Sequence, residues 1–272
     1  MSAFEQFNCV GLSRYGKLVY NQQDEFLRRS IELYGEYRER EAAVFDQIIQ
    51  PGQVVLEIGA NVGAQTLFFA HRVGPQGRVL AFEPRRLSFQ ALCGSLSLNS
   101  ITNVHCWNMA VGAEAGETTI PSKPVTQPGA PSNAAAANDD LGYPPEDEPK
   151  SDETVAVVDL DSLNLPRLDF IKLDSSTAED VLRGAANSIT RHKPIVYVTS
   201  CGGEKEIPLI RRIAASGYAM FWHDAPLFNS DNFAGNSSNV FGDQTARNLL
   251  CIDKAADRQL TGFTQVDVPT AA

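Results

Sequence analysis

Residues 54–70 read VVLEIGANVGAQTLFFA, and residues 78–84 read RVLAFEP. The first stretch predicts a buried strand over 54–58, a glycine-flanked turn over 59–63, and a helix to about residue 73. Glycine lets the backbone approach a ligand closely, and a helix N-terminus offers free N–H groups to a carboxylate or phosphate. The second stretch predicts a strand over 78–82 that ends in Glu83, where an acid can accept both hydroxyls of an adenosine ribose. The two stretches together predict a site for a nucleoside-containing ligand.

Strand and helix patterns alternate along most of the chain. Further helices are predicted over 41–49, 87–99, 178–188 and 206–216, and further strands over 104–108, 154–158, 168–173, 195–198, 218–222 and 246–253. Repeated strand–helix units predict a parallel sheet with right-handed crossovers. No helical pattern lies between the last two strands, so we expect that pair to be antiparallel.

The domain organisation is interrupted once. Seven of the fifteen prolines fall between residues 121 and 150, which predicts a long surface loop instead of a core element. We expect an N-terminal extension over 1–40, one α/β domain over 41–254 with a Pro-rich acidic loop inserted at 121–153, and a C-terminal tail over 255–272.

Composition and charge exclude several classes of protein. The chain has 272 residues and a formal net charge of -10, which disfavours a nucleic-acid binder and an anionic membrane surface as partners. No stretch approaches the eighteen apolar residues of a membrane span, and the first residues show no secretory signal, so we expect a cytoplasmic protein. Five cysteines without a C-x-x-C pair and four scattered histidines predict no metal site.

Most of the negative charge is local. The 23 residues from Asp139 to Asp161 hold nine acids and one base, and so contribute -8 of the net charge. A charge run of this kind is typical of a solvated loop. The alternative interpretation is a flap over the site that repels anionic substrates.

The turn itself distinguishes two cofactors. A dinucleotide fingerprint requires G-x-G-x-x-G, whereas residues 59–63 read G-A-N-V-G and lack the middle glycine that admits a pyrophosphate. The E-x-G-x-N-x-G pattern over 57–63 resembles motif I of the class I S-adenosylmethionine-dependent methyltransferases. An empty Rossmann-type turn without a ligand is the other interpretation.

Several further segments resemble the FkbM family of methyltransferases. These are YGEYREREAAVFDQIIQPGQVVLEIGANVGAQTLFFA, GRVLAFEPRRLSFQALCGSLSLN, NVHCWNMAVGAEAG, LPRLDFIKLD, VLRGA, HKPIVYV and APLFNSDNFAGNSSNVFG, in the family's order over roughly residues 33 to 253. The resemblance implies a Rossmann-like class I methyltransferase fold, with a mostly parallel seven-stranded sheet and helices on both faces. It also implies O-methylation of a small-molecule acceptor, a hydroxyl of a sugar or secondary metabolite, with S-adenosylmethionine as the cofactor. By the match, the cofactor contacts are Glu57, Gly59, Asn61, Gly63, Glu83, and, against the adenine, Ala110 and Val111.

Catalytic candidates follow from the ends of later strands. A hydroxyl acceptor benefits from a general base, and Asp174, at the end of the 168–173 strand, is placed for that role. Asp174 is equally suited to cap the following helix. His223 is the second candidate, although a lone histidine at a strand end is more often a structural hydrogen-bonding group. Asn229, Asp231 and Asn232 are consistent with an acceptor pocket or with loop turn chemistry.

The resemblance fails in two places. The family typically reads D-V-E-G and then a further Glu after the strand that ends near 173, whereas residues 174–179 here read D-S-S-T-A-E. After the next strand, the family often has an acid where residues 199–203 read T-S-C-G-G. Both places lie where open α/β sheets bind ligands, so the departures concern the acceptor more than the cofactor. The alternative function is therefore a non-catalytic cofactor-binding or partner-binding protein on the same fold.

Overall fold

The structure is a computed structural model, and it describes residues 6–120, 152–173, 177–200, 202–203, 206–256 and 263–269. The strands are β1 (Asn8–Ser13), β2 (Gly16–Asn21), β3 (Val54–Ile58), β4 (Arg78–Phe82), β5 (Val104–Trp107), β6 (Ala110–Val111), β7 (Gly116–Ile120), β8 (Glu153–Val158), β9 (Phe170–Leu173), β10 (Ile195–Thr199), β11 (Tyr218–Pro226), β12 (Thr245–Asp253) and β13 (Thr264–Gln265). The helices are α1 (Glu25–Arg29), α2 (Glu39–Ile48), α3 (Ala64–Val73), α4 (Arg86–Leu98), α5 (Ala178–Arg183), α6 (Ala186–His192) and α7 (Glu206–Ala215), with a π-helical turn η1 (Ser30–Tyr34) and 3-10 turns η3 (Asp161–Leu163) and η5 (Lys254–Ala256).

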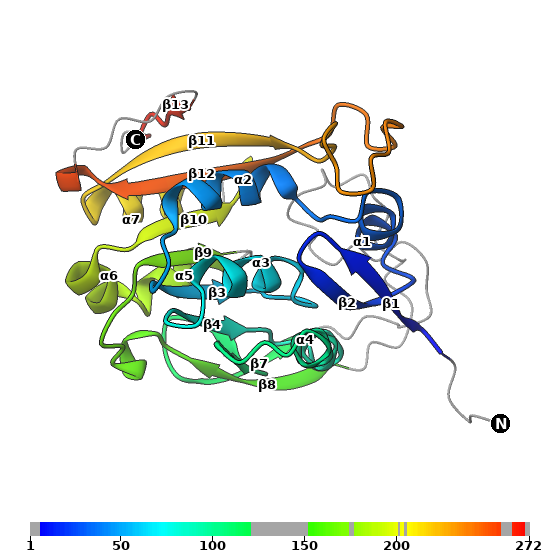
Figure 1. The fold of residues 1–272 in the computed structure, drawn as a ribbon. Coiled ribbons are helices and arrows are strands. Elements are labelled where there is room, and N and C mark those ends of the chain that lie inside the picture. Colours follow the sequence, from blue (N-terminus) through cyan, green and yellow to red (C-terminus); the bar gives the residue numbers. More distant parts are fainter. Residues whose placement is uncertain are drawn as a thin grey trace.

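The main sheet has eight strands within the described residues, in the order β13-β11-β12-β10-β9-β3-β4-β5 (Figure 1). The strands from β10 to β5 are parallel. β12 is antiparallel to β11, as the missing helix between them predicts, and it is also antiparallel to β10. The predicted sheet is one strand short because β13 is only two residues long and has no hydrophobic pattern to indicate it.

Helices cover both faces of this sheet, as predicted. Side chains of α2 and α3, among them Phe45 and Phe69, pack with Val55 of β3 on one face. Side chains of α5, α6 and α7 pack with Leu56 on the other face. Successive strand residues point to opposite faces, so the apolar run over 54–58 supplies both cores. Figure 1 shows α2 and α3 lying over the same face of the sheet.

Two smaller sheets complete the fold. The strand predicted over 154–158 is β8, which pairs with β6 and β7 in a separate three-stranded sheet. The β1–β2 hairpin packs on α4, where Val19 N donates a hydrogen bond of 3.0 Å to Ser95 Oγ. Leu18 and Leu27, from the segment predicted as an N-terminal extension, share a hydrophobic cluster with Leu67 of α3 and Leu92 of α4.

The single helix predicted over 178–188 is wrong, because the structure divides it into α5 and α6. The carbonyl of Gly184 accepts a hydrogen bond of 2.9 Å from Asp161 N, which lies far away in the sequence. A side chain at Gly184 would place its Cβ 2.2 Å from the carbonyl oxygen of Gly112. The chain therefore breaks at a glycine that the close approach of two backbones requires.

Parts of five predictions lie outside the described residues. These parts are residues 1–5 of the N-terminal extension, the acidic Pro-rich loop up to residue 151, Asp174 with the two serines after it, Cys201 in the 199–203 segment, and residues 257–262 and 270–272 of the C-terminal tail. Among the described residues, one edge of the sheet is formed by the carboxyl ends of β3, β4, β9 and β10. Open α/β sheets bind ligands at such an edge.

Candidate functional site

The turn between β3 and α3 adopts left-handed backbone conformations. Gly59, Asn61 and Gly63 have φ values of 82°, 52° and 92°. The amides of Gly59 and Ala60 both donate to the carbonyl of Phe82 at the end of β4, at 2.9 and 3.1 Å. The turn is therefore fixed to the neighbouring strand by main-chain bonds, and Asn61 is a residue type that tolerates the left-handed region.

Helix α3 begins directly after this turn without a side-chain cap. Gly63 is the N-cap residue, and it makes no side-chain hydrogen bond to the first turn of the helix. The first N–H groups of a helix have no partners within the helix, so they remain available to an anionic ligand group. This matches the donor set that the sequence predicts for the turn.

The carboxylate of Glu83 is held against the same turn. Glu83 is 4% exposed, and its Oε2 accepts a hydrogen bond of 2.8 Å from Asn61 N. Its Oε1 accepts one of 2.9 Å from Arg85 N. The two main-chain bonds therefore orient the carboxylate toward the glycine turn.

Asn108 supports this acid, and the sequence reasoning missed it. The Nδ2 of Asn108 donates to the carbonyls of Glu83 and Pro84, both at 2.9 Å. Next to it, the rings of Phe82 and Trp107 are stacked with centroids 4.9 Å apart. A polar residue directly after a strand, at the edge where open α/β sheets bind ligands, is the signal that could have indicated Asn108.

The two residues predicted to contact adenine form β6. Val111 is buried in the core, whereas Ala110 is half-buried. Both pair with β8, at Val158 and Val157 respectively. Ala110 is thus the more accessible of the two, and the adenine contact stays a prediction for both.

Glu57 lies at the inner wall of a small hollow beside the turn. Its Oε2 accepts a hydrogen bond of 2.6 Å from Thr66 Oγ1 of α3. The lining residues of the hollow, contributed by β3, β9, the turn, α3 and the N-terminal segment, are Leu27, Tyr37, Glu57, Gly59, Ala60, Asn61, Val62, Ala64, Gln65 and Lys172. The volume is about 10 Å³, which is room for about one water molecule. The chemistry of the lining fits a zwitterionic amino-acid group, and a ligand of that size requires side chains of the wall to move.

A buried polar network adjoins the hollow. Arg38 and Glu41 form an ion pair of 3.1 Å with both side chains at most 1% exposed. Gln65 and Asn248 donate to the same carboxylate at 3.0 and 3.4 Å. Arg38 is in the left-handed region with φ 50°, a conformation that costs about 1–3 kcal/mol and tends to occur at functional sites. The sequence reasoning missed this network because its members are far apart along the chain.

Two buried polar atoms lie on β10 and β12, at the sheet edge where the sequence predicts the acceptor. Thr199 is the last residue of β10, and Asn248 lies directly opposite it on β12. Thr199 Oγ1 and Asn248 Oδ1 are buried, and neither has a hydrogen-bond partner among the residues that the structure describes. Such atoms are rare in native proteins and call for a partner such as water or a ligand.

His223 lies on β11, level with Asn248 and Thr199. Its Nδ1 is 2.7 Å from the hydroxyl oxygen of Tyr197. Burial lowers the pKa of His223, although Glu41 and Asp224 act in the opposite direction. In the sheet order, β11 is four strands from β3, which is roughly 19 Å at about 4.8 Å per strand. The catalytic role of His223 stays a prediction, and it requires an acceptor that extends from the turn across the sheet edge.

The asparagines of the 229–232 segment form hydrogen bonds with other protein groups. Asn229 Nδ2 donates to Glu36 at 2.9 Å, and Asp231 N donates back to Asn229 Oδ1 at 3.2 Å. Asn232 Nδ2 donates to the carbonyls of Asn229 and Asn236, at 2.9 and 2.6 Å. These contacts favour loop turn chemistry over an acceptor pocket.

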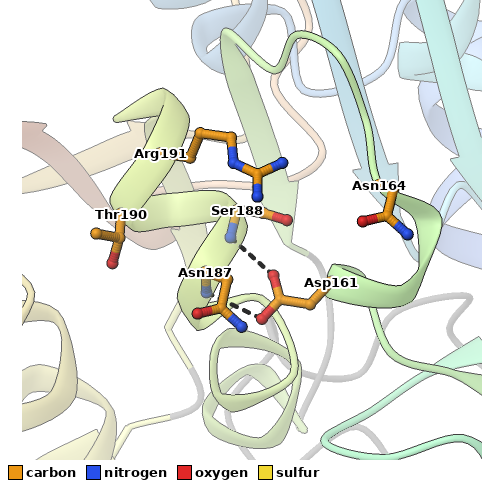
Figure 2. Close-up of a pocket in the computed structure, with 6 residues that line it drawn as sticks. All are labelled: Asp161, Asn164, Asn187, Ser188, Thr190 and Arg191. Atoms are coloured by element: carbon orange, nitrogen blue, oxygen red, sulfur yellow. Dashed lines mark hydrogen bonds between the residues drawn. The ribbon is translucent and has the colours of Figure 1, made fainter.

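A second hollow of about 320 Å³ lies beside α6 (Figure 2). Asp161 accepts hydrogen bonds from the amides of Asn187 and Ser188, at 2.9 and 2.7 Å. Burial raises the pKa of Asp161, but these two amide bonds outweigh it and the net pKa is lowered. The carboxylate therefore caps the helix, and this hollow is open and separate from the turn after β3.

Two general features concern metals and membranes. Over the described parts of the chain, no three His, Cys, Asp or Glu side chains are grouped so that they could hold a metal ion. No helix within those same parts combines the length and the apolar character that crossing a membrane demands.

The fold and the turn define a class I methyltransferase, with a Rossmann-like sheet and with Glu83, directly after β4, beside the glycine turn that follows β3. The chain belongs to the FkbM family, since the model of the methyltransferase FkbM domain matches residues 57–218, more than half of the chain. No curated protein is similar enough in sequence to count as a match.

Solved structures with a similar fold include three methyltransferase-type proteins. A methyltransferase FkbM from Methylobacillus flagellatus KT has 15% identity and a TM-score of 0.46, and the match covers 77% of this chain and 50% of that one. A putative O-methyltransferase from Klebsiella pneumoniae has 12% identity and a TM-score of 0.46, with 79% and 78% covered. Fibrillarin from Aeropyrum pernix, with natively bound S-adenosyl-L-methionine, has 9% identity and a TM-score of 0.42, with 92% and 85% covered. This chain thus spans half the length of the Methylobacillus protein, and the likenesses concern the fold alone.

Proposed function

We propose that this chain is an S-adenosylmethionine-dependent methyltransferase that methylates a hydroxyl oxygen of a small molecule, either a sugar or a secondary metabolite. Membership of the FkbM family supports the reaction type. The single observation that carries the cofactor assignment is the buried carboxylate of Glu83, fixed at 2.8 Å to the amide of Asn61 in the glycine turn. An acid held in this way is prepared to accept ribose hydroxyls without reorganisation.

The residues divide into cofactor and acceptor groups. When bound, S-adenosylmethionine supplies an electrophilic methyl group on a sulfonium. Gly59, Asn61 and Gly63 shape the backbone against which it would lie, and Glu57 and Glu83 offer carboxylates to its ammonium and hydroxyl groups. The protein's main contribution is orientation, because bringing two reactants into line supplies much of the rate enhancement.

The acceptor is proposed to lie over the carboxyl ends of β9 and β10 and the amino-terminal half of β12, which is antiparallel to them. Thr199 and Asn248 place neutral, buried polar atoms there, which suits an acceptor with hydroxyl groups. Asp174, directly after β9, is proposed as the base or positioning acid. His223 is proposed as a second group that contacts the far end of the acceptor.

Binding of the cofactor is tested by titration calorimetry with S-adenosylmethionine. We expect micromolar affinity in the wild type and at least tenfold weaker binding in Glu83→Gln, since a hydrogen bond to a charged group contributes about 1.5–3 kcal/mol. Glu117→Gln, at an exposed position of β7, is the matched control and should bind like the wild type. Absence of heat with the wild-type protein would refute the cofactor assignment.

Catalysis is tested by release of S-adenosylhomocysteine with a panel of hydroxylated sugars and polyketide-type acceptors. Turnover with one class identifies the acceptor. The altered sequences over 174–179 and 199–203 support a second candidate, a non-catalytic binding protein. Cofactor binding without turnover across the panel would favour that second candidate.

A further inference from the structure

Two half-buried cysteines lie side by side near the β5 edge of the main sheet. Cys93 belongs to α4 and Cys106 to β5, and their sulfur atoms are 3.7 Å apart. Cys106 lies directly opposite Ala81 of β4, which shares a buried cluster with Ala91 and Leu92 of α4. The two sulfurs are therefore in the layer where α4 packs on the sheet.

The distance between the two sulfurs is close to what a disulfide needs. An S–S bond is about 2.05 Å long, so the sulfurs have to approach by roughly 1.7 Å. The other cysteines within the described residues are placed differently, since Cys251 is fully buried and the Sγ of Cys9 donates to the carbonyl of Tyr20 at 3.6 Å. Among the described cysteines, Cys93 and Cys106 are thus the pair placed for a disulfide.

The chain that follows Cys106 holds the main chain of Glu83. The carbonyl of Trp107 accepts a hydrogen bond of 3.1 Å from Glu83 N. The Nδ2 of Asn108 donates to the carbonyls of Glu83 and Pro84, both at 2.9 Å. A shift of β5 at Cys106 therefore reaches Glu83 through the next two residues of the chain.

We propose that Cys93 and Cys106 are a site of reversible oxidation by peroxides, and that the disulfide formed between them loosens the hold of β5 on Glu83. The disulfide ties α4 to β5 and draws Cys106 toward the helix, away from its position in the sheet. Its consequence for the affinity of the cofactor rests on the proposed function, whereas its formation and its effect on the main chain do not.

The reaction begins at Cys93. Burial and the neighbouring thiol raise the pKa of Cys106 to about 12, so the Cys106 sulfur is protonated and reacts slowly with peroxide by itself. The Cys93 sulfur attacks one oxygen of hydrogen peroxide, the O–O bond breaks, and a sulfenic acid and water form. The Cys106 sulfur then attacks the Cys93 sulfur, and the S–O bond breaks as the S–S bond forms.

The hydroxyl group that leaves takes the thiol proton of Cys106 and forms a second water molecule. Two electrons thus pass from the two thiols to one molecule of peroxide. A dithiol such as dithiothreitol reverses the reaction by thiol–disulfide exchange, in which the reductant is oxidised to its own disulfide.

The test compares the reduced wild-type protein with the same protein after treatment with hydrogen peroxide. After free thiols are blocked and the protein is digested without reductant, mass spectrometry should find the peptides of Cys93 and Cys106 joined. Amide hydrogen exchange at Glu83 should become faster by about threefold or more. The affinity for S-adenosylmethionine, measured by calorimetry, should fall by about fivefold. Dithiothreitol should reverse all three changes.

Two variants serve as controls. Cys93→Ser has a side chain of similar size and cannot form the disulfide, so peroxide should change neither its amide exchange at Glu83 nor its affinity. Cys9→Ser replaces another half-buried cysteine and should respond to peroxide as the wild type does. The main comparison uses two states of the wild type, so it does not depend on how well a variant folds.

The outcomes separate this inference from the proposed function. Absence of the joined peptides, unchanged amide exchange at Glu83 in the oxidised protein, or an equal response in Cys93→Ser would each overturn the inference. If the reduced wild type binds no S-adenosylmethionine, the proposed function fails, and the joined peptides and the amide exchange still decide this inference.

Discussion

Gly63 ends the turn that precedes α3, and its replacement by alanine is expected to destabilise the fold through two separate effects. Its φ is 92°, and a side chain in the left-handed region costs about 1–2 kcal/mol. A Cβ there would also lie 2.7 Å from Leu92 Cδ1, and Leu92 is fully buried in the cluster beneath α4. Overpacking of a core costs about 1–3 kcal/mol. Gly63→Ala should therefore lower the free energy of unfolding by about 2–5 kcal/mol, measured by urea denaturation.

Gly52→Ala is the matched control for the backbone effect alone. Gly52 has a φ of 82°, and a Cβ added there would meet no atom within 4 Å. Its cost should be only the backbone strain, about 1–2 kcal/mol. In a double-mutant cycle with Leu92→Ala, the contact part of the Gly63→Ala cost should disappear. Equal losses of stability in Gly63→Ala and Gly52→Ala would refute the contact with Leu92 as a cause.

Two other substitutions test the electrostatics and the capping. Burial lowers the pKa of His223 in the folded protein, so the stability that is present above about pH 6.5 should be lost as the pH falls below that value. Between pH 7.5 and 5.5, the unfolding midpoint of His223→Gln should therefore drop less than that of the wild type. Equal drops in both proteins would contradict this reasoning. Asp161→Ala removes the two amide bonds that begin α6 (Figure 2) and should cost about 1–2 kcal/mol in urea denaturation, whereas Asp267→Ala, at an exposed position, should cost less than about 0.5 kcal/mol.

The sequence predicted most of the sheet because its signals are local. The strand over 54–58 and the strand over 78–82 have the same bounds in the structure, since each is a short apolar run closed by glycine or an acid. The break at Gly184 was not predictable, because it depends on Gly112 and Asp161, which lie far away in the sequence. Likewise β13 depends on pairing with β11 and has no pattern of its own.

The glycine turn could be predicted for a related reason. Its geometry is set by main-chain conformation, and the glycines at 59 and 63 report directly on that conformation. Lys172 was not singled out, although a basic residue inside the apolar run FIKL is itself a signal of a buried charge. Thr199 and Asn248 become neighbours only when β12 inserts antiparallel beside β10, which no local pattern specifies.

The N-terminal segment completes the wall of the hollow beside the glycine turn. Most of the wall of the hollow belongs to β3, β9, the glycine turn and α3, which hydrogen bonds hold in place. Leu27 and Tyr37 are the lining residues that come from outside these elements. Leu27 also packs in the cluster that contains Leu67 and Leu92, so the first helix is joined to the same core that supports the turn. Tyr37 packs against the same cluster, and its ring has an edge contact with Phe26 at a centroid distance of 5.7 Å, so packing of the N-terminal segment closes this part of the hollow.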